Sequence, residues 1–178
     1  MSPHNKVKSI TPPQLAFVFT AVTALLFVSL WLINPTELEA NQLELVAVSV
    51  KAITYGFIII SMLTVIWVLF TIRSAPSYER YLELYTVIIL MAASIATFGL
   101  VYRTNGLMLD GLLVYPGFED AFLLSVSLFT SNGMVGGFSP FEEEKVLVAI
   151  QQLVGFIMVP VMIALTLQIV MASPEQSE

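Results

Sequence analysis

The stretch from Thr130 to Gly137 combines neutral oxygen atoms with glycine, which suits the binding of a partly dehydrated cation. Such an ion needs several oxygens at close range, and backbone carbonyls supply them without net charge. Glycine reaches cheaply the backbone conformations that point successive carbonyls toward one axis. The sequence therefore predicts a cation filter, without catalytic residues, formed by Thr130, Ser131, Asn132, Gly133, Met134, Val135, Gly136 and Gly137.

A short apolar segment over residues 118–129 precedes this stretch and would have to position it. A spanning helix needs ~20 apolar residues, so this length favours a core helix or a re-entrant segment. The C-terminal dipole of a helix here would direct partial negative charge at the ion, and Glu119 and Asp120 would lie at its positive end. We expect a re-entrant pore helix; the alternative is a plain extracellular turn after a short surface helix.

The composition is that of an integral membrane protein. Apolar residues make up 57% of the 178 residues and charged residues 11%, well below the roughly one quarter of soluble domains. The charges cluster between long uncharged runs, which predict spanning helices over residues 15–33, 52–72, 84–102 and 146–172. The predicted fold is all-α, with four transmembrane helices and one re-entrant pore helix with its filter loop between the third and fourth.

The predicted spans divide the chain into two parts. Residues 1–83 form an N-terminal two-helix membrane segment, and residues 84–178 form a pore module of outer helix, pore helix, filter loop, inner helix and short tail. The first apolar run could be a signal peptide, but Leu38 makes Leu-Glu-Ala a poor cleavage site, so we expect a retained helix. Tyr102, at the end of the third span, is expected at the membrane interface.

Basic residues indicate the orientation of the spans in the membrane. Lys51 lies at the outer boundary, and the other basic residues divide into an inner set and an outer set: Lys6, Lys8, Arg73 and Arg80, then Arg103 and Lys145. The positive-inside rule places the inner set in the cytoplasm, and with it both termini. We therefore expect an integral protein of the inner (plasma) membrane of a prokaryotic cell, embedded in the lipid bilayer.

Carboxylates gather on the outer side of the predicted filter. The acidic mouth would consist of Glu119, Asp120, Glu142, Glu143 and Glu144. A ring of such groups raises the local concentration of cations. The alternative is that these residues simply solvate the outer loops.

The last predicted span contains a glycine and a proline at Gly155 and Pro160. Proline removes a helix hydrogen bond and glycine loosens the backbone, so together they predict a gating hinge. Glycine and proline are also ordinary in spanning helices, which is the alternative interpretation.

Residues 121–140, followed by residues 146–171, resemble the two-helix pore module of potassium channels. In that family the pore helix leads into a Thr-Val-Gly-Tyr-Gly filter, and an Asp and Ser-Pro commonly follow. Thr130, Gly133 and Gly136 match this pattern, with Ser139-Pro140 behind them and a glycine in the inner helix at Gly155. The departures are Asn132 for Val, Met134 for Tyr, Gly137 for Asp, and one extra residue between the glycines.

The resemblance implies passive conduction of monovalent cations, K⁺ or Na⁺, by a homotetramer in which four loops surround one axis. It does not carry potassium selectivity, because Met134 replaces the tyrosine that helps to set the width of the family's filter.

The residues of an intramembrane enzyme are missing from the sequence. The only histidine is His4, cysteine is absent, and no predicted span holds a pair of carboxylates. A His-based site or a His/Cys metal site therefore cannot form within the membrane. We expect no enzyme activity, no cofactor, no metal beyond the permeating cations and no nucleic-acid partner. A non-conducting accessory or structural subunit with a vestigial pore loop remains the alternative function.

Overall fold

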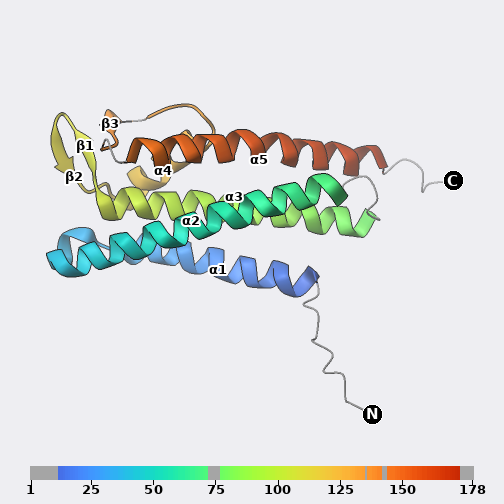
Figure 1. Ribbon diagram of the computed structural model, residues 1–178, viewed down its shortest axis with the longest axis horizontal. Coiled ribbons are helices and arrows are strands. Elements are labelled where there is room, and N and C mark those ends of the chain that lie inside the picture. Colours follow the sequence, from blue (N-terminus) through green and yellow to red (C-terminus); the bar gives the residue numbers. More distant parts are fainter. Residues whose placement is uncertain (1–11, 72–76, 135, 142–143, 173–178) are drawn as a thin grey trace, which may run out of the picture.

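The computed structural model describes residues 12–71, 77–134, 136–141 and 144–172. The described elements, in chain order, are α1 (Pro12–Leu32), the 3-10 helix η1 (Pro35–Glu37), α2 (Ala40–Thr71), α3 (Ser77–Asn105), β1 (Leu107–Leu109), β2 (Leu112–Val114), α4 (Phe118–Phe129), β3 (Phe138–Ser139) and α5 (Lys145–Ala172). The four long helices run along one axis, with η1 and the strands at one end (Figure 1). The first residues of α1 and the last of α5 lie toward the opposite end. The predicted all-α class is confirmed.

Three helices are long and apolar enough to cross a membrane: Ala40–Trp67, Arg80–Asn105 and Lys145–Met171. They contain the third predicted span and most of the second and fourth. The second begins earlier than predicted, at residue 40 rather than 52, because no helix-breaking residue separates Ala40 from the apolar run. The first predicted span corresponds to α1, whose apolar stretch Phe17–Leu32 is shorter than the other three.

Proline and glycine end the first and third helices. Asn34 takes an extended conformation before Pro35, as residues before proline usually do, and α1 stops there. Arg103 of α3 then donates to the carbonyl oxygens of Leu30 and Trp31, which are orphaned at the end of α1. Gly106 ends α3 with a φ of +76°, and a Cβ there would lie 2.6 Å from Leu113 Cδ1.

A small antiparallel sheet of order β2-β1-β3 lies at the end of the bundle that holds η1. Leu109 pairs with Leu112, so Asp110 and Gly111 form a two-residue turn with φ of +52° and +82°. An Asp-Gly pair between short apolar runs is a strong hairpin signal, and the sequence interpretation above missed it. Because β3 pairs with β1, the sheet joins the chain before α4 to the chain after it.

Helix α3 is the central helix of the bundle. More than half of its apolar stretch is buried, 56%, against 17% for α2 and 28% for α5. One buried cluster brings Leu30 of α1 and Val50 of α2 together with Leu124 of α4. The N-terminal two-helix segment and the predicted pore module therefore share a common core.

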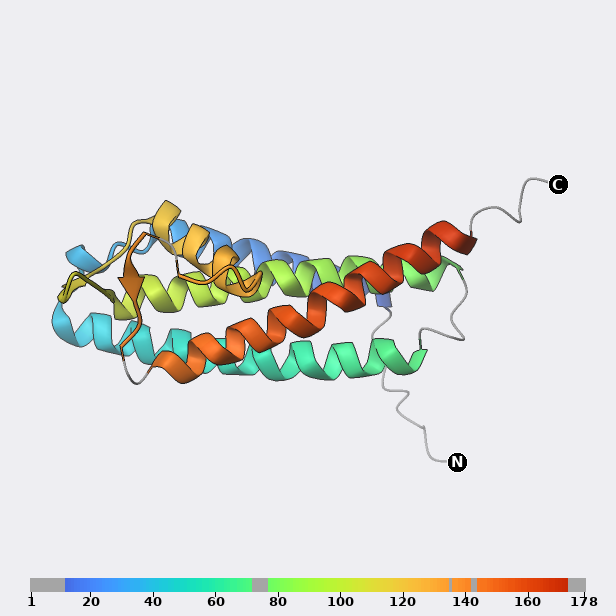
Figure 2. The same cartoon turned by 90° about the horizontal axis from the view of Figure 1, so that it is seen from above.

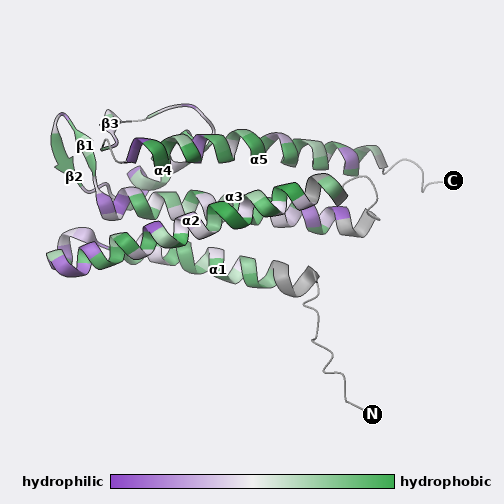
Figure 3. Cartoon of the chain, viewed as in Figure 1, coloured by the Kyte–Doolittle hydropathy of each residue, from purple (hydrophilic) through white to green (hydrophobic). Residues whose placement is uncertain are grey.

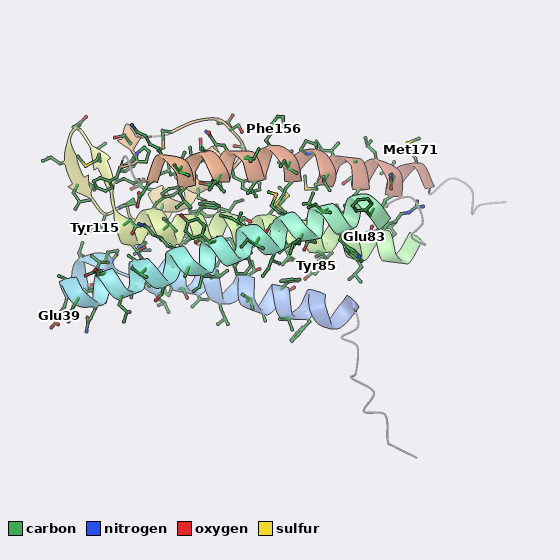
Figure 4. The ribbon with its side chains drawn as sticks, viewed as in Figure 1. Glu39, Glu83, Tyr85, Tyr115, Phe156 and Met171 are labelled. Carbon is green, nitrogen blue, oxygen red and sulfur yellow. The ribbon has the colours of Figure 1, made fainter. Side chains whose placement is uncertain are left out.

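The outer faces of the long helices are apolar, as expected of surfaces in contact with lipid. Leu63 on α2 is exposed, and so is Phe156 on α5, where 72% of the residue is accessible. Figure 3 shows apolar residues along the length of the helices and hydrophilic ones gathered toward the two ends. In Figure 4 the side chain of Phe156 points away from the bundle.

Candidate functional site

The segment that leads to the predicted filter is α4, with the bounds that the sequence predicted. Its 12 residues are about 18 Å long at 1.5 Å per residue. One face is buried against α3 and α5 and includes Ala121, Leu124 and Leu128, whereas Leu123 is exposed. Glu119 and Asp120 are exposed in the first turn, where the helix dipole favours negative charge.

The end of α4 lies beside α5, about one third of the way along that helix. A Cβ built on Gly155 would lie only 1.8 Å from the carbonyl oxygen of Phe129, the last residue of α4, so the two backbones touch. Gly155 comes about ten residues after Lys145, which places this contact about 15 Å along α5. Figure 2 shows α4 beside the first half of α5 and the chain after it returning toward the sheet.

A chain of buried hydrogen bonds connects α4 with both neighbouring helices. Tyr102 of α3 donates its hydroxyl hydrogen to Oε1 of Gln151 on α5. Gln151 Nε2 donates to the carbonyl oxygen and to Oγ of Ser125 on α4, at 2.8 and 2.9 Å. Ser125 Oγ in turn donates to the carbonyl oxygen of Ile95 on α3, at 2.7 Å. All three polar side chains are fully buried.

Tyr102 therefore corrects an expectation from the sequence. The prediction placed it at the membrane interface, but its side chain lies within the bundle with no exposed surface. The hydroxyl tolerates this position because Gln151 accepts its hydrogen bond.

The predicted filter begins with a tight turn that folds back on α4. The backbone N–H of Asn132 donates to Ser127 O at 2.9 Å, and Asn132 Nδ2 donates to Thr130 Oγ1 at 2.8 Å. Ser127 Oγ donates to the carbonyl oxygen of Gly133 at 2.7 Å. Ser131 and Gly133 have φ of +59° and +85°, and only the glycine adopts this region without strain.

The structure divides the eight predicted filter residues into three groups. Thr130, Ser131 and Asn132 are exposed together at the end of α4. Gly133 and Met134 are half-buried, with Met134 packed on the core, while Val135 lies outside the described residues. Gly136 and Gly137, with φ of +71° and +75°, are exposed and lead into β3.

The predicted acidic mouth divides in a similar way. Glu119 and Asp120 are exposed, whereas Glu142 and Glu143 lie outside the described residues. Glu144 is buried, with a side chain 5% exposed, and its Oε1 lies 3.6 Å from Nζ of Lys51 on α2. Glu144 therefore forms an ion pair between the start of α5 and α2, which the sequence pattern did not reveal.

The two predicted hinge residues lie in different surroundings. Gly155 is buried against Phe129, and Pro160 is exposed one and a half turns further along α5. The helix continues through both residues to Ala172. Close packing against α4 is thus a reason for a glycine at Gly155 that sequence reasoning did not consider.

Sequence reasoning also missed Tyr102, Ser125 and Ser127 as residues that position the site. A signal for them was present, because a glutamine at Gln151 inside a long uncharged helix needs a buried partner. No group of His, Cys, Asp and Glu residues that could hold a metal ion is found among the described residues. No family model, curated protein or solved structure matches the chain.

Proposed function

We propose that the chain is the subunit of a passive cation channel with a potassium-channel-like pore. One observation carries the proposal: three polar residues, Thr130, Ser131 and Asn132, are exposed beside a helix long enough to span the membrane, about 15 Å from its start. Polar, non-helical backbone at that depth must be covered by protein or face water. In this proposal α4 is a re-entrant pore helix, and the turn that follows it, residues 130–132, lines a water-filled path for ions.

The chemistry of the turn suits a monovalent cation, K⁺ or Na⁺. The turn contains hydroxyl, amide and carbonyl oxygens and no charged side chain. The C-terminal carbonyls of α4 add a partial negative charge, which favours a cation over an anion. Glu119 and Asp120, exposed at the opposite end of α4, would attract cations to the entrance.

A homotetramer is part of the proposal because one turn offers oxygens from a single direction. Four copies around a symmetry axis would surround the ion, with each α5 as an inner helix and its Gly155–Pro160 region as the hinge of a gate. Helix α1 would be a fourth transmembrane helix. The bundle would have both termini in the cytoplasm and the sheet outside a prokaryotic inner membrane.

A specific contact favours a second candidate, the non-conducting accessory subunit. The carbonyl oxygen of Gly133, at the centre of the proposed filter, accepts a hydrogen bond from Ser127 Oγ. In this arrangement it faces α4 and does not face an ion. A loop held in this way would keep a pore-like fold without passing current.

Recording from the purified protein in planar bilayers would decide between the two candidates. Native mass spectrometry would first establish the tetramer, and opposing KCl and NaCl solutions would then give the permeability ratio. We expect a cation current that Thr130→Val changes in conductance or selectivity, because that variant removes an oxygen from the turn.

Thr64→Val is the matched control, since both hydroxyls donate to the carbonyl four residues earlier and Thr64 lies on α2. An intact tetramer that passes no current would support the accessory subunit. A Thr130→Val channel identical to wild type would argue against the turn as the ion path.

A further inference from the structure

We propose that Gln151 is a positioning residue that fixes the depth and rotation of α4. It thereby fixes the position of the polar turn formed by residues 130–132. Its amide lies between α4 and α3, donating to Ser125 and accepting from Tyr102. The inference rests on the proposed ion path, because it assigns Gln151 a role in the geometry of that path.

The hydrogen bonds of Gln151 leave no spare donor on its amide. Both Nε2 hydrogens are used by Ser125, one on the carbonyl oxygen and one on Oγ, and Oε1 accepts from Tyr102. Ser125 Oγ donates its hydroxyl hydrogen to the carbonyl oxygen of Ile95. The donors of this network therefore all point in one direction, from Tyr102 through Gln151 and Ser125 to Ile95. Displacing Gln151 or Ser125 breaks three of these hydrogen bonds in a buried region.

This arrangement discriminates between positions of α4 that apolar packing alone would tolerate. A shift of α4 by one residue moves it about 1.5 Å and rotates it by about 100°, which takes Ser125 away from Gln151. Hydrogen bonds between helices in a membrane stabilise a bundle only modestly, but a buried amide without partners is costly. The main effect of the network is therefore to select one register of α4, and its contribution to stability is smaller.

The polar turn at residues 130–132 begins less than two helical turns after Ser125. A change in the register of α4 therefore moves the polar turn directly. Thr130 directly follows the last residue of α4, about five residues after Ser125, and Asn132 donates to Thr130. Loss of the Gln151 contacts should leave the turn intact but at several depths. In the proposed tetramer, that change would alter which oxygens of the four copies face one another.

The test uses Gln151→Met, which keeps the length of the side chain and removes its hydrogen bonds. Gln152→Met is the matched control, since Gln152 is adjacent and half-buried and has no hydrogen bond to α4 among the described residues. Because the chain has no cysteine, spin labels can be attached at Leu123→Cys on α4 and Leu153→Cys on α5, both exposed positions. Doubly labelled chains are assembled with an excess of unlabelled chains, so that most tetramers hold one labelled subunit. Double electron–electron resonance then gives the distribution of distances between the two labels of that subunit.

We expect Gln151→Met to broaden or shift this distribution and to change the K⁺/Na⁺ permeability ratio severalfold, while Gln152→Met alters neither. An unchanged distribution would overturn the inference, and so would a changed distribution with the wild-type permeability ratio. If Gln151→Met does not assemble, Tyr102→Phe removes one hydroxyl only; it should shift the distances less, and no shift would count against the inference. A wild type without current would overturn the proposed function, while the distances would still test the anchoring of α4.

Discussion

Gly155 on α5 and Phe129 at the end of α4 are in direct backbone contact, and a Cβ on the glycine would lie 1.8 Å from the phenylalanine carbonyl oxygen. The same Cβ would lie 2.8 Å from the carbonyl carbon of Phe129. Both obstacles belong to the backbone, so a side chain cannot be accommodated by a rotamer change. The contact fixes how closely α4 approaches α5.

Gly155→Ala should therefore destabilise the protein by about 1–3 kcal/mol, the usual cost of overpacking a core. Thermal unfolding in detergent would measure the change. Gly56→Ala on α2 is the control, because its Cβ would meet nothing within 4 Å. Removing that glycine from a helix interior should be neutral or stabilise by about 0.5–1 kcal/mol. Equal effects of the two substitutions would contradict the close contact.

Ser127→Ala should release the carbonyl oxygen of Gly133 from α4. The lost hydrogen bond should cost about 1 kcal/mol, and the amides of the turn should exchange faster with deuterium. In a conducting tetramer the released carbonyl could face the ion path, so we expect a larger current. Ser49→Ala, which removes an exposed hydroxyl bonded only within α2, should change neither exchange in the turn nor current.

The ion pair between Lys51 and Glu144 should contribute modestly to stability because Lys51 is partly exposed, at 37% of its side chain. Lys51→Met should cost about 1 kcal/mol, since it removes a cation near a buried carboxylate. A double-mutant cycle with Glu144→Gln would isolate the interaction, and the double variant should lose less than the sum of the single losses. Strict additivity would show that the pair adds nothing.

Neutralising Glu119 and Asp120 together, as Glu119→Gln/Asp120→Asn, should reduce the conductance of the proposed channel at low ionic strength. Both carboxylates are exposed at the start of α4, where they would raise the local cation concentration. The Debye length falls from about 30 Å at 0.01 M salt to about 3 Å at 1 M, so the difference should vanish in concentrated KCl. Glu44→Gln, an exposed carboxylate on α2, should have little effect at either concentration.

The elements with a strong local signal could be predicted from the sequence. Uncharged runs predicted four spanning helices, of which three are long and apolar enough to cross a membrane, and the short apolar segment over residues 118–129 predicted α4. The early start of α2 was not predicted from hydropathy, because Asn41, Gln42 and Glu44 make its first residues polar. The hairpin also had a local signal, the Asp110-Gly111 pair between short apolar runs, although the sequence prediction did not include it.

The contacts of the site were harder to predict, because they join residues distant in the chain. Tyr102 and Gln151 are 49 positions apart, and the sequence around either residue does not indicate that the other is its hydrogen-bond partner. In the sequence, a glycine at position 155 is compatible with a hinge and with a close packing contact. The packing contact becomes evident only from the position of Phe129 in the fold. Residue types indicated which groups need partners, whereas the tertiary fold decided which partners they have.

The pairing of β1 with both β2 and β3 has a mechanical consequence for the segment between Gly106 and Ser139. The segment leaves α3 and returns toward α5 through neighbouring strands, and α4 lies between these strands in the sequence. Insertions are best tolerated at the exposed Asp110-Gly111 turn, where a Cβ on Gly111 would meet nothing within 4 Å. The stretch that contains α4 does not share this tolerance, because α4 packs against α3 and α5.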